Sequence, residues 1–270
     1  MLKMAETRTA RGGSSVTPYL LGKVPGKEPL ALRLGQSRHA VEQKNNEDFY
    51  GVVTPDLEPD AAARGIALAV ADGASGVGAG RIASETAVRS LLHDFYSTPA
   101  AWAVSQAVDC VLRSINDWLL VENMRQPDAD GVVTTLSFLL FRDNFYYLAH
   151  VGDTRVYRKR GSVLKQLTVD HTWPRSDMRH VLKRAIGLDT HLVVDFADGE
   201  LQARDIFLMV SDGVWEVLGD KLMHEIVDAH DDPQAIAKKL TDRSIGSQAR
   251  YMGRNDATAL VAIVDAPGIP

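Results

Sequence analysis

The sequence predicts an α+β fold built from antiparallel sheets. Three observations support this prediction. Short apolar runs of strand character follow one another with turn residues between them. Two groups of consecutive helical patterns interrupt these runs. The strands therefore neither alternate singly with helices nor all precede them, which argues against a doubly wound parallel sheet.

The first half of the chain contains strand-like runs followed by two helices. The runs are predicted at residues 31–37, 49–54 and 65–72. A helix is predicted over residues 78–97, where Val88, Leu91 and Phe95 recur at helical spacing. A second helix is expected from about Pro99 to Met124. Because the two helices are consecutive, we expect them to pack as an antiparallel pair.

The second half begins with a predicted β-meander. Its three strands are expected at residues 132–143, 144–160 and 162–168, with turn-forming residues between them. The remaining elements are a short polar helix at 176–185, strands at 192–201 and 205–213, helices at 214–229 and 233–247, and a final strand at 257–265.

The composition indicates a globular protein without a nucleic-acid partner. The 270 residues are 45% hydrophobic, enough for the core of one large domain or two ordinary ones. The net charge is −5 and no dense run of Lys or Arg occurs, so the electrostatic signature of a nucleic-acid binder is missing. The single cysteine, Cys110, excludes an internal disulfide, and we expect it to be a buried structural thiol.

Both ends of the chain have the composition of loose segments. Residues 1–30 are rich in Gly, Ser, Thr and Pro and are predicted to be a flexible N-terminal segment, and residues 266–270 a tail or linker. No apolar core of signal-peptide length follows the N-terminus, and no window approaches the roughly 18 apolar residues of a membrane span. A cytoplasmic protein that does not contact a membrane is therefore expected.

Five aspartates share one position in the pattern, at the end or bend of an apolar strand-like run. They are Asp48 in NNEDF, Asp72 in AVADGAS, Asp153 in AHVGDTR, Asp212 in MVSDGV and Asp256 in RNDAT. Clustered carboxylates raise one another's pKa, and a bound cation resolves this repulsion. Oxygen ligands suit magnesium or manganese. Zinc is disfavoured because the eight histidines show neither HxxxH nor HxH spacing.

Each of these motifs taken singly also fits a plain turn. An Asp-Gly pair after a strand is a common turn sequence, because Asp tolerates turn conformations and Gly adopts positive φ. The order and spacing of the whole set therefore carry the metal-site hypothesis.

Seven motifs in order resemble those of the metal-dependent protein phosphatase family (PPM, type 2C). They are NNEDF, AVADGASGVGAG, VVTTL, AHVGDTRVYR, LTVDH, MVSDGVWEVL and RNDATALVAI, and they cover about residues 32–265. The resemblance implies a four-layer αββα sandwich, in which helix pairs flank two antiparallel sheets, and a catalytic domain over residues 31–265. The chain has only about ten residues between His171 and Leu182, so the flap that family members carry there is expected to be shortened.

The resemblance also implies a centre of two Mn²⁺ or Mg²⁺ ions. On the matching positions Asp72 bridges the ions, the Gly73 carbonyl serves one of them, and Asp212 with Asp256 binds the other. Glu47 and Asp48 are expected to act through bound water or beside the ligands, with Asp48 or metal-bound water protonating the leaving group. Asp153 is expected to provide a third-metal site.

The implied activity is hydrolysis of phosphoserine or phosphothreonine in proteins. Two divalent ions would activate a water for in-line attack on the phosphorus, without a covalent phosphoenzyme. Phosphoproteins are the expected partners. A cognate serine/threonine kinase is suggested by similarity to bacterial phosphatase modules that are joined to such a kinase. A monomer is expected.

The substrate side departs from the family pattern. Gln43 occupies the position of the usual phosphate-binding Arg, and Lys44 or Arg38, expected in the same loop, could replace it. The VVTTL motif is interpreted as β-branched residues of a buried strand. The last motif reads Asn-Asp-Ala rather than Asp-Asn, which should spare metal binding through its aspartate.

Two other functions remain open on the sequence. The departures would suit a pseudophosphatase that uses the same fold as a regulatory or binding module. An unrelated metal-dependent phosphodiesterase or nuclease would also use clustered carboxylates, although the missing basic groove argues against it.

Overall fold

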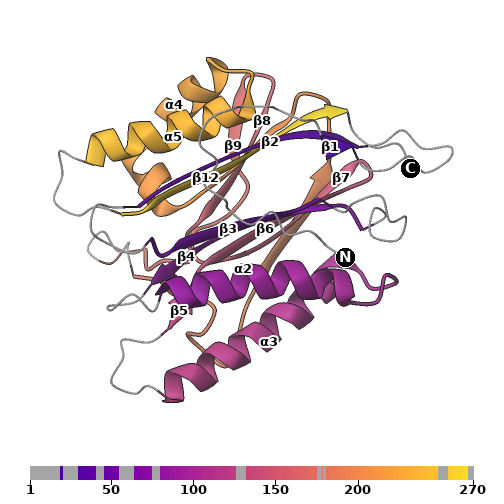
Figure 1. Cartoon of the computed structure of the whole chain (residues 1–270), viewed down its shortest axis with the longest axis vertical. Coiled ribbons are helices and arrows are strands. Elements are labelled where there is room, and N and C mark those ends of the chain that lie inside the picture. The colour runs from indigo at the N-terminus through magenta and orange to yellow at the C-terminus, as the bar shows by residue number, and fades with distance from the viewer. Residues whose placement is uncertain are drawn as a thin grey trace, which may run out of the picture.

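The computed structural model confirms the predicted architecture. It describes residues 19–20, 30–40, 46–54, 64–74, 80–125, 132–174, 178, 181–248 and 255–266. Two antiparallel sheets lie face to face, and a pair of helices covers the outer side of each (Figure 1). The four-layer αββα sandwich expected from the sequence is therefore the observed fold.

The first sheet has the strand order β10-β7-β6-β4-β3, with β5 pairing with β4. Its strands are β3 (Asp48–Val53), β4 (Ile66–Ala74), β5 (Val133–Thr134), β6 (Leu136–Arg142), β7 (Phe145–Val151) and β10 (Asp195–Glu200). The helices α2 (Gly80–Ser97) and α3 (Val104–Arg125) cover its outer face. The second of these helices begins later than predicted, because Pro99 to Trp102 form a turn closed by Trp102 N donating to Pro99 O at 3.0 Å.

The second sheet has the order β1-β2-β12-β11-β8-β9. Its strands are β1 (Tyr19–Leu20), β2 (Ala31–His39), β8 (Arg155–Arg160), β9 (Val163–Gln166), β11 (Ile206–Val210) and β12 (Ala257–Ala266). The helices α4 (Asp212–Asp228) and α5 (Pro233–Gln248) cover it. Within the predicted N-terminal segment, the structure describes Leu30 and the two residues of β1, which pair with β2.

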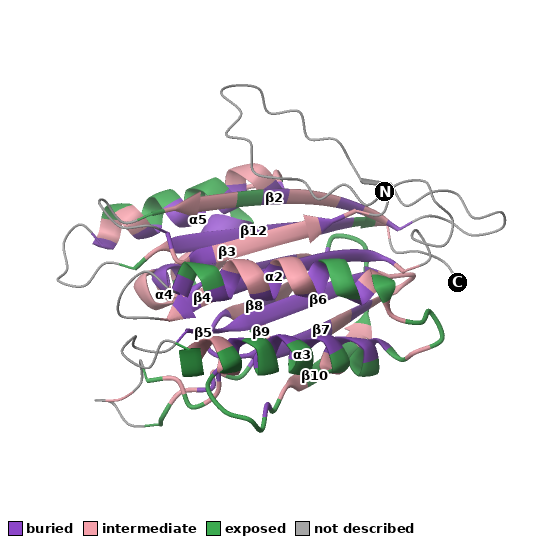
Figure 2. Cartoon of the chain, turned by 60° about the horizontal axis from the view of Figure 1, so that its bottom comes forward, coloured by how far each residue is buried: buried purple, intermediate pink, exposed green. Residues whose placement is uncertain are grey.

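The alternation of residues in β4 shows how the sequence builds three apolar layers. Ala67, Ala69 and Ala71 face α2 and α3, whereas Leu68 and Val70 face the second sheet. Successive side chains of a strand point to opposite faces, so small residues on one face let the helices approach while larger ones fill the space between the sheets. A third apolar cluster lies under α4 and α5. Figure 2 shows the buried strands between exposed outer helix faces.

The predicted strand over residues 144–160 is wrong, because it divides at Gly152. The first part is β7 in the first sheet and the second part is β8 in the second sheet. Gly152 has φ = 108°, a conformation that favours glycine, and its α-carbon lies against Thr135. Apolar periodicity marks strand faces but does not show that the chain passes from one sheet to the other at this turn.

The short polar helix predicted at residues 176–185 is also wrong where the structure describes it. Residue 178 is a turn, and the segment 181–185 is extended or bent. Leu182 forms an isolated bridge with Thr172, and Trp173 N donates to Val181 O at 3.2 Å. These backbone contacts replace helical hydrogen bonds on the return segment of the shortened flap.

Candidate active site

Three of the five predicted aspartates are brought together by strand pairing and by the start of a helix. Asp48 begins β3 and lies directly opposite Asp72 in β4. Asp212 is the first residue of α4, and its carboxyl lies close enough to that of Asp72 to raise the pKa of Asp72. The carboxylates therefore come from two strands of the first sheet and from the helix that follows β11 of the second sheet, segments that lie far apart in the sequence.

Asp256 precedes β12 and joins this group through the backbone of Glu47. Glu47 N donates to Asp256 Oδ2 at 2.7 Å, and Asn255 Nδ2 donates to Asp212 Oδ2 at 2.9 Å. The loop before β12 thus contributes the Asp256 carboxylate to the group, and its Asn255 side chain holds the Asp212 carboxylate. The Asn-Asp order of this motif, noted as a departure in the sequence, keeps an amide on Asp212.

Ser211 connects Asp48 to the second sheet. Its hydroxyl donates to Asp48 Oδ2 at 2.7 Å and accepts from Thr258 N at 3.0 Å. Ser211 and Asp48 are both buried. This serine was not predicted from the sequence, although it directly precedes Asp212 in MVSDG.

Two buried threonines fix the backbone of Asp72. Asp72 N donates to Thr135 Oγ1 at 2.9 Å, and Asp72 O accepts from Thr134 Oγ1 and from Thr135 N, each at 2.9 Å. The sequence interpretation of these threonines as buried strand residues is confirmed for Thr134 of β5, whereas Thr135 is buried but lies between β5 and β6. Their hydrogen bonds to the aspartate were not predicted, because β-branched residues in a strand give no sign of what their hydroxyls contact.

Close backbone packing sets the position of Asp72 and Gly73 at the end of β4. A Cβ atom on Gly73 would lie 2.0 Å from Gly80 O, so the start of α2 touches this end of the strand. Gly73 N donates to Glu47 O at 3.2 Å, and Ser84 Oγ donates to the same carbonyl at 2.5 Å. Ser84 therefore supports the backbone of Glu47 next to this contact.

Burial and mutual repulsion raise the pKa values of four carboxyl groups. Burial raises the pKa of Asp48 to about 7, and the neighbouring Asp212 and Asp256 add to the rise. Burial, with repulsion from Asp153, also raises the pKa of Asp212 to about 7. The pKa of Asp72 lies well above its usual value because of burial and then of Asp48, Asp212 and Asp153.

Burial raises the pKa of Asp153 to about 6, with Asp170 adding to the rise. Without a cation this group of carboxyls holds protons near neutral pH, as carboxyls that share a site do. A divalent cation in their midst would replace those protons.

A family model described as Protein phosphatase 2C matches residues 35–243 of the chain. The chain belongs to the protein phosphatase 2C family. This membership confirms the family that the seven motifs indicated and the predicted enzyme class, a protein serine/threonine phosphatase.

Bacterial relatives and solved structures agree with the assignment. The chain is 28% identical over 247 residues to "Serine/threonine phosphatase stp" of Listeria monocytogenes serotype 4b (strain F2365), spanning 84% of this chain and 91% of the relative. It superposes with TM-score 0.72 and 27% identity on PppA of Pseudomonas aeruginosa, covering 86% and 97% of the two chains. The TM-score is also 0.72 for the catalytic domain of PstP in complex with two manganese ions, with 26% identity over 88% and 100% of the chains.

The carboxyl groups of this phosphatase are the candidate ligands for a metal ion. Among the residues that the structure describes, no three Asp, Glu, His or Cys side chains converge as the ligands of a metal ion. The donor set nevertheless fits a hard divalent ion, because Asp48, Asp72 and Asp212 are oxygen donors that hold protons in place of a cation.

Asp153 lies in the turn between β7 and β8, 8% exposed. Trp215 Nε1 donates to Asp153 O at 2.9 Å, and the Arg155 guanidinium lies 3.4 Å from the Trp215 ring centroid. Glu216 adds to the raised pKa of both Asp153 and Asp212. This glutamate was missed in the sequence analysis, although it follows Asp212 by one helical turn and so projects from the same end of α4.

Of the three predicted phosphate-binding residues, the structure describes Arg38 alone, since Gln43 and Lys44 lie outside the described residues. The expectation that Arg38 belongs to the loop is wrong, because it lies in β2 opposite Thr258. Arg38 Nη1 donates to Asp48 O at 3.0 Å, so its guanidinium lies beside the backbone of the carboxylate group.

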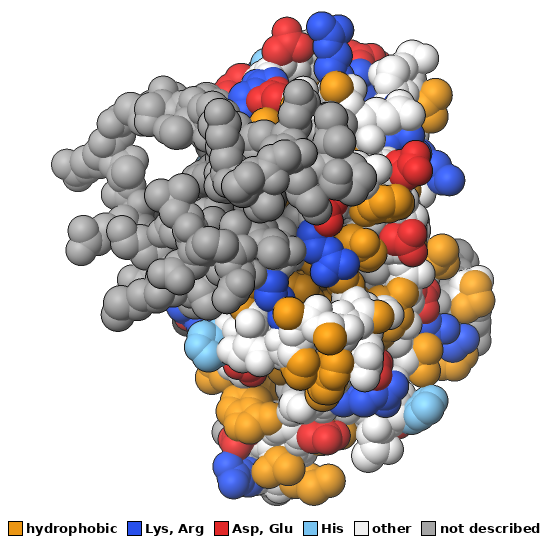
Figure 3. All heavy atoms as spheres, turned by 90° about the vertical axis from the view of Figure 1, so that its right-hand side faces the viewer, with side chains coloured by type: hydrophobic (Ala, Val, Ile, Leu, Met, Phe, Trp, Pro, Cys, Tyr) orange, Lys and Arg blue, Asp and Glu red, His pale blue; other side chains and the backbone are white. Residues whose placement is uncertain are grey.

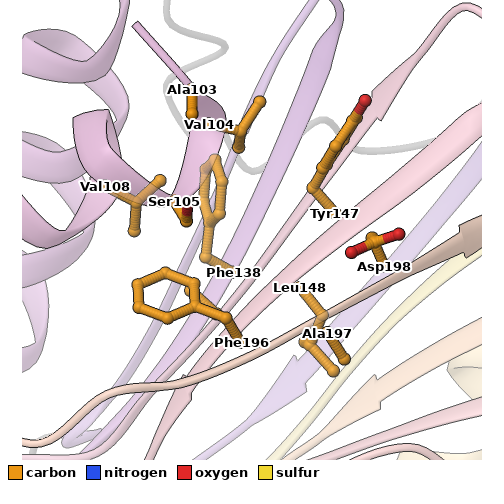
Figure 4. A pocket seen from close by; sticks show the side chains of 11 residues that line it. Ala103, Val104, Ser105, Val108, Phe138, Tyr147, Leu148, Phe196, Ala197 and Asp198 are labelled. Atoms are coloured by element: carbon orange, nitrogen blue, oxygen red, sulfur yellow. The ribbon is translucent and has the colours of Figure 1, made fainter.

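An apolar cavity of about 140 Å³ lies apart from the carboxylates, between α3 and the β7–β10 side of the first sheet. Figure 4 shows Phe138, Tyr147, Leu148 and Phe196 around it. None of the five predicted aspartates lines this cavity.

In the part of the chain that the structure describes, no helix is long and apolar enough to cross a membrane.

Gly213→Ala should lower both stability and activity, because the new Cβ would lie 2.0 Å from Asp256 O. Overpacking of this kind costs about 1–3 kcal/mol, and relief of the clash would move Asp256 away from Asp212. Urea unfolding and phosphatase assays measure the two effects. Gly246→Ala is the matched control, since nothing lies within 4 Å of its Cβ position in α5, and it should stabilise the chain by roughly 0.5–1 kcal/mol. Equal stability of the two variants would contradict the prediction.

Proposed function

We propose that this phosphatase hydrolyses phosphoserine and phosphothreonine in proteins, using two Mn²⁺ or Mg²⁺ ions held by the carboxylate group. The observation that carries the proposal is the meeting of Asp48, Asp72 and Asp212, whose pKa values are raised by burial and by one another. The two manganese ions in the PstP structure, a relative of the same fold, support the choice of metal.

The placement of the acids supports a set of ligands. Asp72, which lies opposite Asp48 and near Asp212, would hold the ions together with the Gly73 carbonyl of the same strand. Asp212 and Asp256 would hold the other ion, and Asp153 would provide a third site. The ions, when bound, supply Lewis-acid stabilisation of the phosphoryl oxygens and an activated water.

Asp48 is the proton donor to the leaving alcohol in this proposal, and Glu47 holds Asp256. Asp48 lies opposite Asp72 at the start of β3, so its carboxyl is placed beside the site where the leaving alcohol would form. Ser211 orients it by donating to Oδ2. Glu47 acts through its backbone N–H on Asp256 Oδ2.

Phosphate recognition is assigned to Arg38 near the end of β2 and to two residues between β2 and β3. Arg38, beside the Asp48 backbone, and Lys44 are the cations proposed to bind the substrate phosphate, with Gln43 as a neutral donor. Lys binds phosphate as a point charge, whereas Arg offers a bidentate fork, so weaker phosphate affinity is expected if Lys44 carries the role. A cognate serine/threonine kinase would generate the phosphoprotein substrates.

The purified chain should hydrolyse p-nitrophenyl phosphate and a phosphothreonine peptide with millimolar Mn²⁺ and lose this activity in EDTA. Phosphate release measures both reactions. Absence of metal-stimulated hydrolysis would support the pseudophosphatase alternative instead. Faster hydrolysis of bis-p-nitrophenyl phosphate than of the monoester would indicate a phosphodiesterase or nuclease. On the described part of the face in Figure 3, basic and acidic side chains are interspersed and form no continuous basic stripe.

A further inference from the structure

His171 lies between three segments that meet beside the carboxylate group. It is 5% exposed and follows β9, in the LTVDH motif. The ring of His150 from β7 packs against it, with 4.8 Å between the ring centroids. The side chain is therefore held in one place, and its two nitrogens contact different parts of the fold.

The first contact is a pair of hydrogen bonds with Gly152. Gly152 N donates to His171 Nδ1 at 3.1 Å, and His171 N donates to Gly152 O at 2.8 Å. Gly152 is the residue before Asp153, and its opposite side packs against Thr135, which holds Asp72. His171 thus clamps the turn that carries one predicted metal ligand, and Gly152 of that turn contacts Thr135, which supports another.

The second contact is a hydrogen bond from Nε2, which agrees with the tautomer that the Gly152 contact requires. Because Nδ1 faces an N–H donor, it must accept, so the proton of the neutral ring is on Nε2. Nε2 donates to Asp195 Oδ2 at 2.9 Å. Arg184 Nη1 lies 3.2 Å from the same nitrogen and donates to Asp195 Oδ1 at 2.9 Å.

The third contact is the backbone carbonyl of His171. It accepts from Lys183 N at 2.7 Å and from Arg184 N at 3.4 Å, where the chain returns from the shortened flap. The same residue therefore joins the return segment of the flap, β10 and the turn before Asp153.

We propose that His171 is a positioning residue of the phosphatase, which holds Asp153 in its working place by accepting a hydrogen bond from the Gly152 amide. The proposal rests on the proposed function, because it assigns Asp153 to the metal site. The Asp195 and Arg184 contacts hold the ring in the tautomer that can accept. His171 touches neither substrate nor metal, and it acts through the turn.

Two isosteric variants separate the two ring contacts. In His171→Asn the amide oxygen takes the place of Nδ1 and can still accept from Gly152 N. In His171→Gln the amide nitrogen takes the place of Nε2 and can still donate to Asp195, but the acceptor for Gly152 is lost. If His171 only stabilised the fold, both variants would lose activity in proportion to their loss of stability.

The test combines hydrogen exchange of the Gly152 amide in the metal-free protein with kcat and KM for p-nitrophenyl phosphate in Mn²⁺. We expect the Asn variant to keep the amide protected and to keep kcat within about threefold of the wild type. We expect the Gln variant to lose protection and to lower kcat by roughly 10–100-fold, as loss of a residue that orients a ligand does, with KM little changed.

Two results would overturn the proposal, namely equal Gly152 protection in both variants, or a Gln variant as active as the Asn variant. A wild-type chain without Mn²⁺-dependent turnover would refute the proposed function instead. The amide exchange alone would still decide whether His171 clamps the turn, so the two failures are distinguishable.

Discussion

Replacement of Asp72 by Ala should reduce Mn²⁺-dependent hydrolysis of p-nitrophenyl phosphate by more than roughly 100-fold, beyond the effect of losing a residue that only orients a ligand. Asp212→Ala should do the same. Both carboxyls form one proton-sharing group, and neither belongs to the three apolar layers that hold the fold. The expected loss of activity therefore comes from lost ligands and not from unfolding.

The folded state of these variants can be checked by circular dichroism and thermal unfolding without metal. Because the removed acid is repelled by its neighbours, the Asp72 variant should be as stable as the wild type or more stable at pH 7.5. Asp198→Asn is the matched control, since Asp198 is an exposed acid of β10 outside the carboxylate group, and its activity should be unchanged. Near-wild-type turnover in Asp72→Ala would refute the ligand assignment.

The metal-free chain should also lose a large part of its stability as pH rises from about 4 to about 7. The folded pKa of Asp48 is about 7, above the ordinary value of 3.8. In that window the folded state binds more protons than the unfolded state, so the free energy of unfolding falls with rising pH. For Asp48 alone the fall amounts to roughly 4 kcal/mol. Asp212, Asp72 and Asp153 act in the same direction.

One buried histidine opposes this trend. Burial lowers the pKa of His150 to about 4, which makes stability rise between that pH and the ordinary histidine range.

The difference in the free energy of unfolding between wild type and Asp48→Asn isolates the contribution of the carboxylate. In urea unfolding with EDTA, the free energy of unfolding of the Asn variant should rise above that of the wild type. The difference should grow progressively between about pH 5 and pH 7.5, a range that spans the raised pKa. In Mn²⁺ the wild type should recover stability, because the ion replaces the protons. A difference that does not change with pH would contradict the prediction.

The sequence predicts the layers well because each strand carries its own evidence. The alternation of Ala and larger residues in β4 is visible in the letters IALAVAD, and it already separates a helix-facing side from a sheet-facing side. The helices α4 and α5 likewise show apolar spacing within a few residues of their observed bounds. Such local patterns need no knowledge of the partner element.

The sequence does not predict how the chain passes between sheets. At Gly152 the apolar pattern continues from β7 into β8, and only positive φ and the contact with Thr135 reveal the crossing. The predicted flap helix failed for a related reason. Its polar residues fit a helix by propensity, whereas the segment is held by backbone bonds to His171, a non-local partner that propensity does not include.

The aspartates of the candidate site could be proposed from their motifs, but their supporting residues could not. Ser211 and Thr135 act through single hydroxyls whose targets lie in other strands. In the sequence Glu216 has the pattern of an ordinary acid on a helix surface. Only the fold brings it near Asp212 and Asp153. Spacing along the chain identifies a possible ligand, and three-dimensional pairing alone identifies what orients it.

The most direct measurement is an anomalous difference map from crystals grown with Mn²⁺. Two peaks should lie within ligand distance of the Asp72 carboxylate, one of them also beside Asp212 and Asp256. The Asp72→Asn variant, crystallised in the same way, should lose at least one of these peaks. A map without a peak next to Asp72, or with manganese bound only elsewhere on the chain, would contradict a metal-dependent centre at these carboxylates.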